Sequence, residues 1–477
     1  GVGKAGSEYA FPYSKHVDAI HRIQKWFVEE TRLGIPVDFT NEGIRGLCHT
    51  KATYFPAQSG QGATWDKDLI ARIGEVEAKE ACALGYTNIY SPILDIAQDP
   101  RWGRCVESYG EDPYLAGQLG KQMIMSLQKH RLVSTPKHFA VYSIPVGGRD
   151  GKTRTDPKVA PREMRTLYLD PFRVAFTEAG ALGTMSSYND YDGVPVSGSS
   201  WFLTDLLRKE WGFDGFVVSD WGACNDPAAA TAAGGNLNMP NPGFDCAQYV
   251  CDAIAGGQLS EQDVDDRLRE LLPVILECLE RPAGSFDQDA HHALAQKCAE
   301  QSVVLLENDG ILPLRSGAKI ALIGEFAQKP RYQGAGSSQV NPTRVDNLVD
   351  AMAATGMDVT YAQGYARFSA PDRELTKQAL AAAKSADVVL LCVGLDELSE
   401  TEGRDRANLN LPDNQLALIR AVSKVNSNVV LVLFGGAPFL MPRSDYFRAA
   451  VHGYLGGQAG ATAMANVLTG KVNPSGH

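Results

Sequence analysis

Short apolar runs alternate with longer amphipathic stretches over about the first 280 residues. The apolar runs predict strands at 35–41, 87–95, 132–140, 183–189 and 215–220. Between these runs, apolar positions recur at helical spacing and predict helices at 66–85, 113–130, 162–180 and 204–212. Ser260 and Asp263 form a capping-box pattern at the start of a further helix, which Pro273 is expected to kink or divide.

Repeated strand–helix units predict an α/β fold, an N-terminal (β/α)8 TIM-like barrel, with a doubly wound sheet as the alternative. The barrel is favoured because polar residues follow the apolar runs at their C-terminal ends, where barrels carry their chemistry. These residues are Glu42, Asp95, Lys137, His138, Tyr188 and Asp220.

A second pattern begins after residue 282. Four nearly continuous apolar runs, at 319–326, 387–395, 428–436 and 449–457, are typical of strands buried on both faces. We therefore expect an α/β sandwich domain with a mostly parallel sheet. The predicted division is a catalytic barrel at 1–282, a linker and docking helix at 283–316, and the sandwich at 317–477, shortened at its C-terminus. Because the glycine-rich segment 334–338 lacks the lysine of a phosphate loop, nucleotide binding is disfavoured.

Charge and composition narrow the functional classes. The chain has 45 basic and 56 acidic residues, a net charge of −11, which disfavours nucleic acid and membrane partners. No apolar run reaches the roughly 18 residues of a membrane span. Nine scattered cysteines without a CxxC pair suggest buried thiols in a reducing compartment, so a cytoplasmic location is expected, or a secreted or periplasmic one if a signal peptide was removed. The histidines do not cluster with carboxylates at metal-ligand spacing, and no metal or cofactor is expected.

The candidate chemistry lies in carboxylates, cationic donors and aromatic rings. Asp220 precedes Trp221 at a strand end, which suits attack on an anomeric carbon beside an indole; a helix-capping aspartate is the alternative. Lys137 and His138 offer two donors, or a buried structural histidine. The charged run 396–406 is either functional or a solvated face. Because no GxSxG segment is present, a serine hydrolase is disfavoured and a glycosidase is favoured.

The chain resembles the two-domain, β-glucosidase type of family 3 glycoside hydrolases. The segments that carry the resemblance follow the order of that family along nearly the whole chain: DPRWGRCVESYGEDP, PKHFAVY, MSSYND, GFDGFVVSDW, AEQSVVLLENDGILPL, RYQGAGSSQVNPT, ETEGRDR and HGYLGGQAG. The resemblance implies a retaining β-glycosidase built from a (β/α)8 barrel and an α/β sandwich.

The resemblance also implies roles for individual residues. Asp220, in the SDW segment, corresponds to the catalytic nucleophile, and Glu402, in the EG-x-DR segment, to the acid/base, with Glu400 as the fallback. The residues implied to line or flank the −1 sugar subsite are Glu42, Arg104, Lys137, His138, Arg149, Tyr188 and Trp221.

The implied function is exo-acting hydrolysis of terminal non-reducing β-linked sugars through a glycosyl-aspartate intermediate, most simply by a β-glucosidase. The implied substrates are oligosaccharides or aryl β-glycosides, and an oligomer is compatible with the sequence. Glu42 and Cys48 depart from the pattern of many glucosidases and admit xylose. The alternatives are therefore a β-xylosidase or α-arabinosidase of the same family, or a sugar-binding degenerate relative without turnover.

Overall fold

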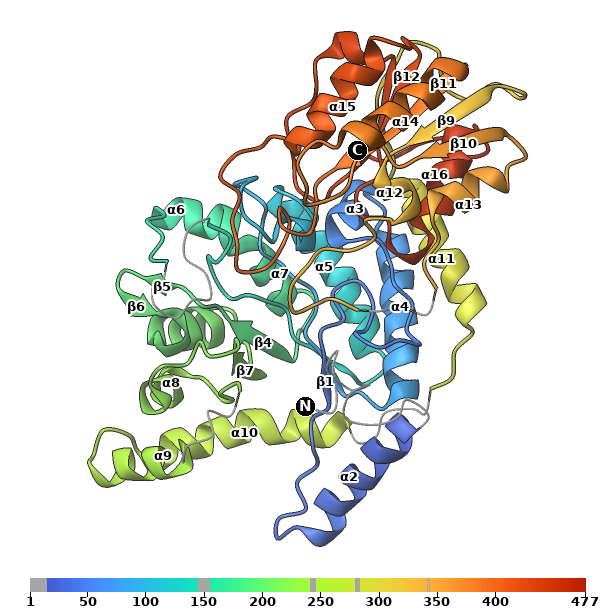
Figure 1. Ribbon diagram of the computed structural model, residues 1–477. Coiled ribbons are helices and arrows are strands. Elements are labelled where there is room, and N and C mark those ends of the chain that lie inside the picture. Colours follow the sequence, from blue (N-terminus) through green and yellow to red (C-terminus); the bar gives the residue numbers. More distant parts are fainter. Residues whose placement is uncertain (1–14, 145–154, 241–245, 279–283, 341, 343) are drawn as a thin grey trace. The chain divides into compact units, whose positions relative to one another are not determined.

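The computed structural model describes residues 15–144, 155–240, 246–278, 284–340, 342 and 344–477 (Figure 1). Contact clustering divides the chain into two compact units. The first contains Gly1–Ala52, Asp66–Gln98 and Glu111–Phe286, and the second contains Thr53–Trp65, Asp99–Gly110 and Asp287–His477. Two short segments inside the predicted barrel region therefore group with the second unit. The boundaries proposed at 282 and 316 stay predictions.

The first unit alternates strands with helices. Its strands are β1 (Thr40–Asn41), β2 (Asn88–Ile89), β3 (Val133–Ser134), β4 (Gly183–Ser186), β5 (Asp190–Tyr191), β6 (Val194–Pro195) and β7 (Phe216–Ser219). Its helices are α2 (His16–Glu30), α4 (Lys67–Leu84), α5 (Pro113–Gln128), α6 (Pro161–Glu163), η3 (Met164–Tyr168), α7 (Asp170–Thr177), η4 (Val196–Gly198), η5 (Trp201–Glu210), α8 (Pro227–Ala233), α9 (Cys246–Ala255) and α10 (Glu261–Glu277).

The strand order of the first unit follows the order of the sequence. β1, β2 and β3 pair in parallel, as do β4 and β7. Parallel bridges extend this series from Phe139 to Ser186 and from Val218 to Leu237. Helices separate the successive strand positions. A doubly wound sheet would reverse its strand order part-way, so the sequential order is that of a (β/α) barrel. Closure by eight strands stays a prediction.

Local side-chain chemistry explains where the helices start and stop. The Asp66 carboxylate accepts a hydrogen bond from the Leu69 amide at 2.9 Å and caps α4. Gly85 ends the same helix with φ +90°, a conformation that glycine adopts without a steric cost. The capping box of Ser260 and Asp263 at α10 is confirmed. α10 continues through Pro273 as one helix, so the predicted division there is wrong.

The second unit is built around one sheet of six strands. Its strands are β8 (Val304–Asn308), β9 (Lys319–Ile323), β10 (Asp358–Ala362), β11 (Val388–Gly394), β12 (Val429–Phe434) and β13 (Ala449–His452). Its helices are α3 (Gln58–Ala63), η2 (Cys105–Glu107), α11 (Gln288–Ser302), α12 (Glu325–Gln328), α13 (Leu348–Ala353), α14 (Arg373–Ser385), α15 (Asp413–Ser423), η7 (Ser444–Tyr446), η8 (Gly457–Ala459) and α16 (Gly460–Leu468).

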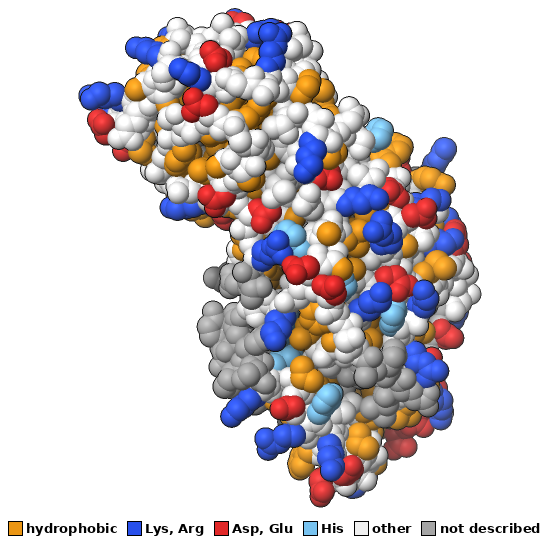
Figure 2. All heavy atoms as spheres, turned by 90° about the vertical axis from the view of Figure 1, so that its right-hand side faces the viewer, with side chains coloured by type: hydrophobic (Ala, Val, Ile, Leu, Met, Phe, Trp, Pro, Cys, Tyr) orange, Lys and Arg blue, Asp and Glu red, His pale blue; other side chains and the backbone are white. Residues whose placement is uncertain are grey.

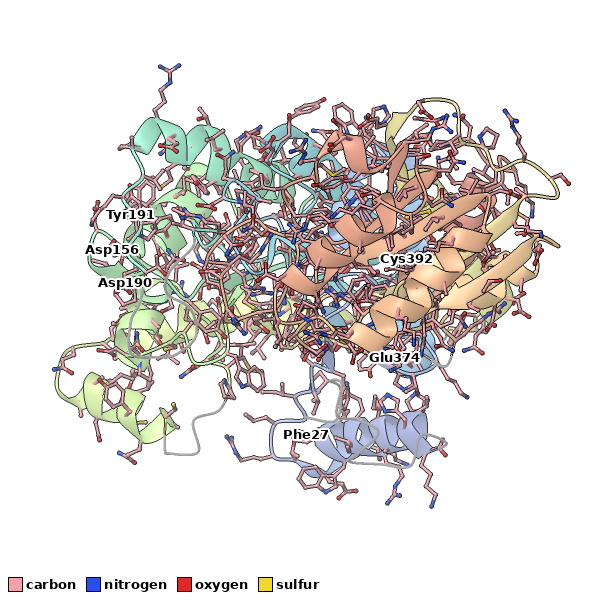
Figure 3. All side chains as sticks on the ribbon, turned by 45° about the horizontal axis from the view of Figure 1, so that its top comes forward. Phe27, Asp156, Asp190, Tyr191, Glu374 and Cys392 are labelled. Atoms are coloured by element: carbon pink, nitrogen blue, oxygen red, sulfur yellow. The ribbon has the colours of Figure 1, made fainter. Side chains whose placement is uncertain are left out.

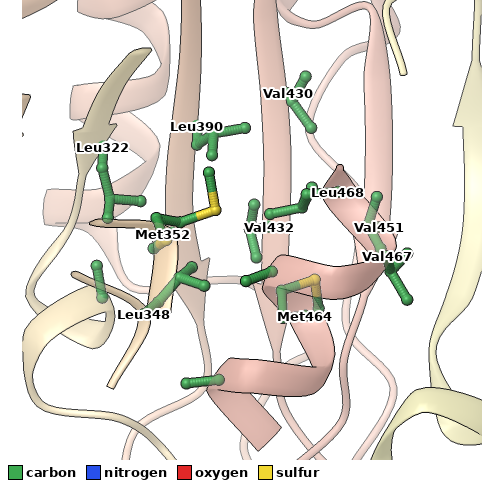
Figure 4. Close-up of a cluster of buried hydrophobic side chains, with 14 of the residues drawn as sticks. Leu322, Leu348, Met352, Leu390, Val430, Val432, Val451, Met464, Val467 and Leu468 are labelled. Atoms are coloured by element: carbon green, nitrogen blue, oxygen red, sulfur yellow. The ribbon is translucent and has the colours of Figure 1, made fainter. Parts of the chain in front are cut away.

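The sheet of the second unit has the order β10-β9-β11-β12-β13-β8. All neighbouring strands pair in parallel except β13 and β8, which are antiparallel. Apolar side chains from one face of the sheet pack with Leu348 and Met352 of α13 and with Met464 and Leu468 of α16 (Figure 4). Because the central strands β11 and β12 are buried on both faces, their sequences are continuously apolar. This confirms the predicted mostly parallel sheet.

The described surface carries mixed charge. On the face shown in Figure 2, acidic and basic side chains are interspersed. Among the described residues, no helix has the length and apolar composition that a bilayer crossing requires. Exposed aromatic side chains gather on α2, where Trp26 is 56% exposed and Phe27 is 37% exposed (Figure 3).

Two histidines are buried against each other in the first unit. The ring centroids of His16 and His49 lie 4.7 Å apart, with Tyr86 beside them. Burial lowers the pKa of both rings, and for His49, which also faces His16, the pKa falls to about 4. Each ring is therefore neutral in the folded protein at pH 7.

This pair predicts acid-dependent stability. The unfolded chain binds protons on His49 from about pH 6.5 downwards, whereas the folded chain does so only near pH 4, so stability falls across that interval. We expect a loss of about 2–3 kcal/mol between pH 7 and pH 4 from this residue. Urea unfolding at several pH values would measure it. His49→Gln should show a flatter profile over the same interval, and parallel profiles would contradict the prediction.

Candidate active site

Asp220 lies directly after β7, as its position beyond an apolar run predicts. Its side chain is 11% exposed. Oδ1 accepts a hydrogen bond from the Trp221 amide at 2.7 Å, and Oδ2 lies 3.6 Å from Nε2 of His138. A buried carboxylate with a cationic or N–H donor nearby is held in its ionised form. Asp220 is thus placed as an anionic, partly accessible carboxylate at the end of a strand.

Asp95 fixes the orientation of His138. Oδ2 of Asp95 lies 2.6 Å from Nδ1 of His138 and accepts the His138 amide at 3.0 Å. Because an ionised carboxylate only accepts, Nδ1 carries a proton and the ring presents Nε2 to Asp220. Asp95 was recognised as a strand-end residue in the sequence, but its contact with His138 could not be predicted there.

Lys137 and Glu42 form a second buried pair in the same unit. Nζ of Lys137 lies 2.5 Å from Oε2 of Glu42, and both side chains are buried. Lys137 also lies over the ring of Tyr90, 5.9 Å from its centroid. Burial, assisted by Asp38, raises the pKa of Tyr90, which keeps the phenol protonated. An ammonium beside a carboxylate supplies a donor and an acceptor of the kind that sugar hydroxyls require.

Aromatic rings flank these polar groups. The Tyr188 hydroxyl donates to the Trp221 carbonyl at 3.0 Å. The Tyr142 ring lies 5.8 Å from that of Tyr188 and 5.0 Å from the ring of His138. Trp221 is 45% exposed, so its indole is accessible to a ligand. The sequence predicted Tyr188 and Trp221 in this group but missed Tyr142, although Tyr142 lies in the PKHFAVY segment.

Glu402 lies in the second unit, in a loop that follows β11. Its side chain is only 3% exposed. Oε2 accepts hydrogen bonds from the backbone amide of Ser337, at 2.8 Å, and from the Ser337 hydroxyl. Oε1 lies 3.5 Å from Nη1 of Arg104. Gly336 adopts φ +115° here, and a Cβ on it would lie 2.6 Å from Cβ of Glu402. A side chain at position 336 would therefore collide with Glu402.

Arg104 stands between two carboxylates of the second unit. Its Nη2 lies 2.6 Å from Oε2 of Glu107, much closer than Nη1 lies to Glu402. The Ser338 hydroxyl lies 3.5 Å from the other oxygen of Glu107. Because Glu107 anchors the guanidinium, Arg104 is held in place without a ligand.

The remaining residues of the EG-x-DR segment fasten the Glu402 loop. Asp405 accepts the Gly103 amide at 2.9 Å. The Arg406 amide donates to the Arg101 carbonyl, and its guanidinium donates to the Pro438 carbonyl at 2.6 Å. A Cβ on Gly103 would lie 2.0 Å from the Arg404 carbonyl oxygen, so only glycine fits. The charged run is thus an anchored loop, not a solvated face.

Glu400 has a different environment from Glu402. It is fully buried, at 0% exposure. One oxygen accepts the amides of Gly436 and Ala437, both at 2.6 Å, and the other lies 3.0 Å from Nη2 of Arg331. A carboxylate with this set of donors is typical of a structural ion pair.

Removing the Glu400 charge is expected to destabilise the second unit. Glu400→Gln leaves Arg331 as a buried charge and should lower the free energy of unfolding by about 3 kcal/mol. Chemical denaturation would measure the change. The matched control is Glu374→Gln on α14 (Figure 3), an exposed glutamate whose loss should cost less than about 0.5 kcal/mol. Equal effects of the two substitutions would contradict the structural role.

Two further expectations concern what the structure describes. Arg149, predicted near the sugar subsite, lies outside the described residues. Within the described part of the chain, no group of three or more His, Cys, Asp or Glu side chains is arranged to hold a metal ion. The remaining predicted residues fall into two sets: Glu42, Lys137, His138, Tyr188, Asp220 and Trp221 in the first unit, and Arg104, Glu400 and Glu402 in the second.

Two sequence models cover most of the chain. The model described as "Glycosyl hydrolase family 3 N terminal domain" matches residues 6–274. The chain belongs to glycosyl hydrolase family 3. The model described as "Glycosyl hydrolase family 3 C-terminal domain" matches residues 303–477. The two-domain fold of family 3 is therefore the fold of this chain.

Known members of family 3 resemble the chain along most of its length. Thermostable beta-glucosidase B of Acetivibrio thermocellus is 37% identical over 465 residues, covering 93% of this chain and 61% of the relative. An exo-alpha-(1->6)-L-arabinopyranosidase of Bifidobacterium longum is 38% identical, covering 89% and 57%. The crystal structure of a family 3 beta-glucosidase from Bifidobacterium adolescentis matches with a TM-score of 0.87 and 37% identity, covering 93% and 66%. The chain thus spans about three fifths of the length of these curated relatives.

Proposed function

We propose that this family 3 chain is a retaining, exo-acting β-glycosidase, with β-glucosides as the first choice of substrate. The observation that carries the proposal is Asp220, an accessible strand-end carboxylate that faces the Asp95-oriented ring of His138. Family membership and the similarity to two β-glucosidases support the same activity. The expected substrates are short oligosaccharides or aryl β-glycosides with a terminal non-reducing sugar.

In the first step, a carboxylate oxygen of Asp220 attacks the anomeric carbon while Glu402 donates a proton to the departing glycosidic oxygen. The bond to the aglycone breaks and a glycosyl ester forms on Asp220. In the second step, Glu402 takes a proton from water, the water oxygen attacks the anomeric carbon, and Asp220 leaves as a carboxylate. Two inversions leave the β configuration retained. This mechanism uses two carboxyl groups about 5–5.5 Å apart.

Glu402 is the better candidate for the acid/base than Glu400. General acid–base catalysis needs a carboxyl group that can exchange its proton with the substrate. Glu400 accepts three donors in a fully buried site and is held by Arg331. Glu402 has a serine hydroxyl and a longer contact with Arg104, which leaves its proton easier to exchange.

A related specificity is the second candidate. The similarity to an exo-alpha-(1->6)-L-arabinopyranosidase favours testing an α-arabinoside, together with a β-xyloside, beside the β-glucoside. All three substrates would use the same two carboxyl groups, so the choice between them depends on the sugar subsite and not on the reaction.

The experiment is hydrolysis of p-nitrophenyl β-glucoside, β-xyloside, α-arabinoside and β-N-acetylglucosaminide by the purified chain. Release from one of the first three, with the β configuration of a released glucose observed by NMR before mutarotation, would support the proposal. Sugar-induced thermal stabilisation without hydrolysis would instead identify a sugar-binding protein. Inversion of configuration would overturn the retaining mechanism.

A further inference from the structure

The loop of residues 334–338 is shaped around the Glu402 carboxylate. The Ala335 amide donates to the Glu400 carbonyl at 3.1 Å, and the Glu402 amide donates to the Ala335 carbonyl at 3.3 Å. A parallel bridge between Ala335 and Thr401 completes this pairing. Gly336 then turns with positive φ, which brings the next residue, Ser337, onto Oε2 of Glu402. The loop and the Glu402 segment are therefore one hydrogen-bonded structure within the second unit.

We infer that Ser337 is a positioning residue for Glu402: its hydroxyl stabilises the ionised carboxylate, the form that acts as the base when water attacks the glycosyl intermediate. The inference rests on the proposed function and deepens it. Ser337 itself does not contact the reacting atoms. It acts through Glu402, because a hydrogen bond to an ionised carboxylate favours that form over the protonated acid.

The charged groups around Glu402 in the second unit leave Ser337 as the adjustable one. Arg104 approaches Oε1 at 3.5 Å, but Glu107 holds the guanidinium more tightly, at 2.6 Å. Asp405, in the same loop, accepts the Gly103 amide. Glu400, two residues before Glu402, pairs with Arg331. The nearest donors to Glu402 are thus the amide and hydroxyl of Ser337.

A substitution at Ser337 removes one donor and spares the other. In Ser337→Ala the backbone amide remains 2.8 Å from Oε2, so the carboxylate keeps its position and loses only the hydroxyl. The variant thus tests the hydrogen bond and not the shape of the loop. Ser337→Thr retains a hydroxyl on the same Cβ and serves as the conservative rescue.

The test is the pH dependence of kcat/KM on a β-glycoside with a poor leaving group, such as an alkyl glycoside. Glu402 must be protonated for the first step, so activity declines on the alkaline side as it ionises. Ser337→Ala should move this decline to higher pH by about one unit. Ser337→Thr should return the decline to the native pH. In Ser337→Ala, kcat on a p-nitrophenyl glycoside should also fall about tenfold, because a less stable anion is removed from the second step.

The matched control is Ser399→Ala. Ser399 lies three residues before Glu402, and its hydroxyl donates to Asp396 at 2.8 Å. Its loss should leave the alkaline decline unchanged. A uniform fall in kcat/KM for Ser337→Ala, with the decline at its native pH, would overturn the inference and leave Ser337 a purely structural residue.

Failure of the inference differs from failure of the proposed function. If Glu402→Ala keeps native activity on the alkyl glycoside, Glu402 is not the acid/base, and both the proposed function and the role of Ser337 are wrong. If Glu402→Ala loses that activity and Ser337→Ala shows no pH shift, only the role of Ser337 is wrong.

Discussion

Replacing Asp220 with alanine is expected to lower kcat by about 10⁴-fold or more, equivalent to at least ~5 kcal/mol of lost transition-state stabilisation. Alanine cannot form the glycosyl ester, so the two-step route is closed. The side chain is small, 11% exposed, and its Oδ1 accepts only the neighbouring Trp221 amide among the contacts described above, so the strand should fold without it. Turnover of the preferred p-nitrophenyl glycoside measures the loss.

The control for Asp220 is Asp214→Ala. Asp214 is exposed and precedes the same strand, β7, at its other end. Its removal should leave kcat unchanged within about twofold, because surface substitutions away from the site have small effects. Native activity in a correctly folded Asp220→Ala protein would overturn the nucleophile assignment and with it the reaction class.

The second large effect is expected for Glu402→Ala, and it should depend on the leaving group. For an alkyl glycoside, which needs a proton donor, kcat/KM should fall by about 10³-fold. For a p-nitrophenyl glycoside, whose phenolate leaves without a proton, formation of the glycosyl ester should be nearly native, and its breakdown should limit the rate. Steady-state kinetics with both substrates, together with a burst of p-nitrophenol, measures the difference.

Added azide distinguishes an acid/base residue from a structural one. Azide attacks the glycosyl ester without needing a general base, so it should raise kcat of Glu402→Ala and form a β-glycosyl azide. Glu400→Gln is the matched control, because its expected defect is in folding and azide cannot correct it. Azide rescue of Glu400→Gln, and none of Glu402→Ala, would exchange the roles of the two glutamates.

Much of the fold could be predicted from local sequence pattern. The apolar runs at 132–140 and 215–220 contain the parallel strands β3 and β7, and Asp220 follows directly after β7. The cap at Ser260 was visible because its partner, Asp263, lies one helical turn away. Such features depend on neighbours in the sequence, which a pattern records directly.

The contacts that shape the site depend on distant residues and could not be read in this way. Nothing near Asp95 in the sequence indicates that its carboxylate meets the ring of His138, 43 residues later. Ser337 lies 65 residues from Glu402, in a segment whose glycines suggested only flexibility. Glu400 and Glu402 look alike in a charged run, yet alternate residues of an anchored loop meet different partners. Tertiary packing alone separates the buried ion pair from the candidate acid/base.

The interleaving of the two units along the chain constrains how family 3 sequences can be recombined. The second unit takes residues 53–65, 99–110 and 287–477. A single crossover near residue 287 would pair Glu402 and Ser337 of one parent with Arg104 and Glu107 of the other. The guanidinium and the two carboxylates beside it would then come from unmatched backbones. Chimeras that exchange all three segments together should therefore retain function more often than those joined at one point.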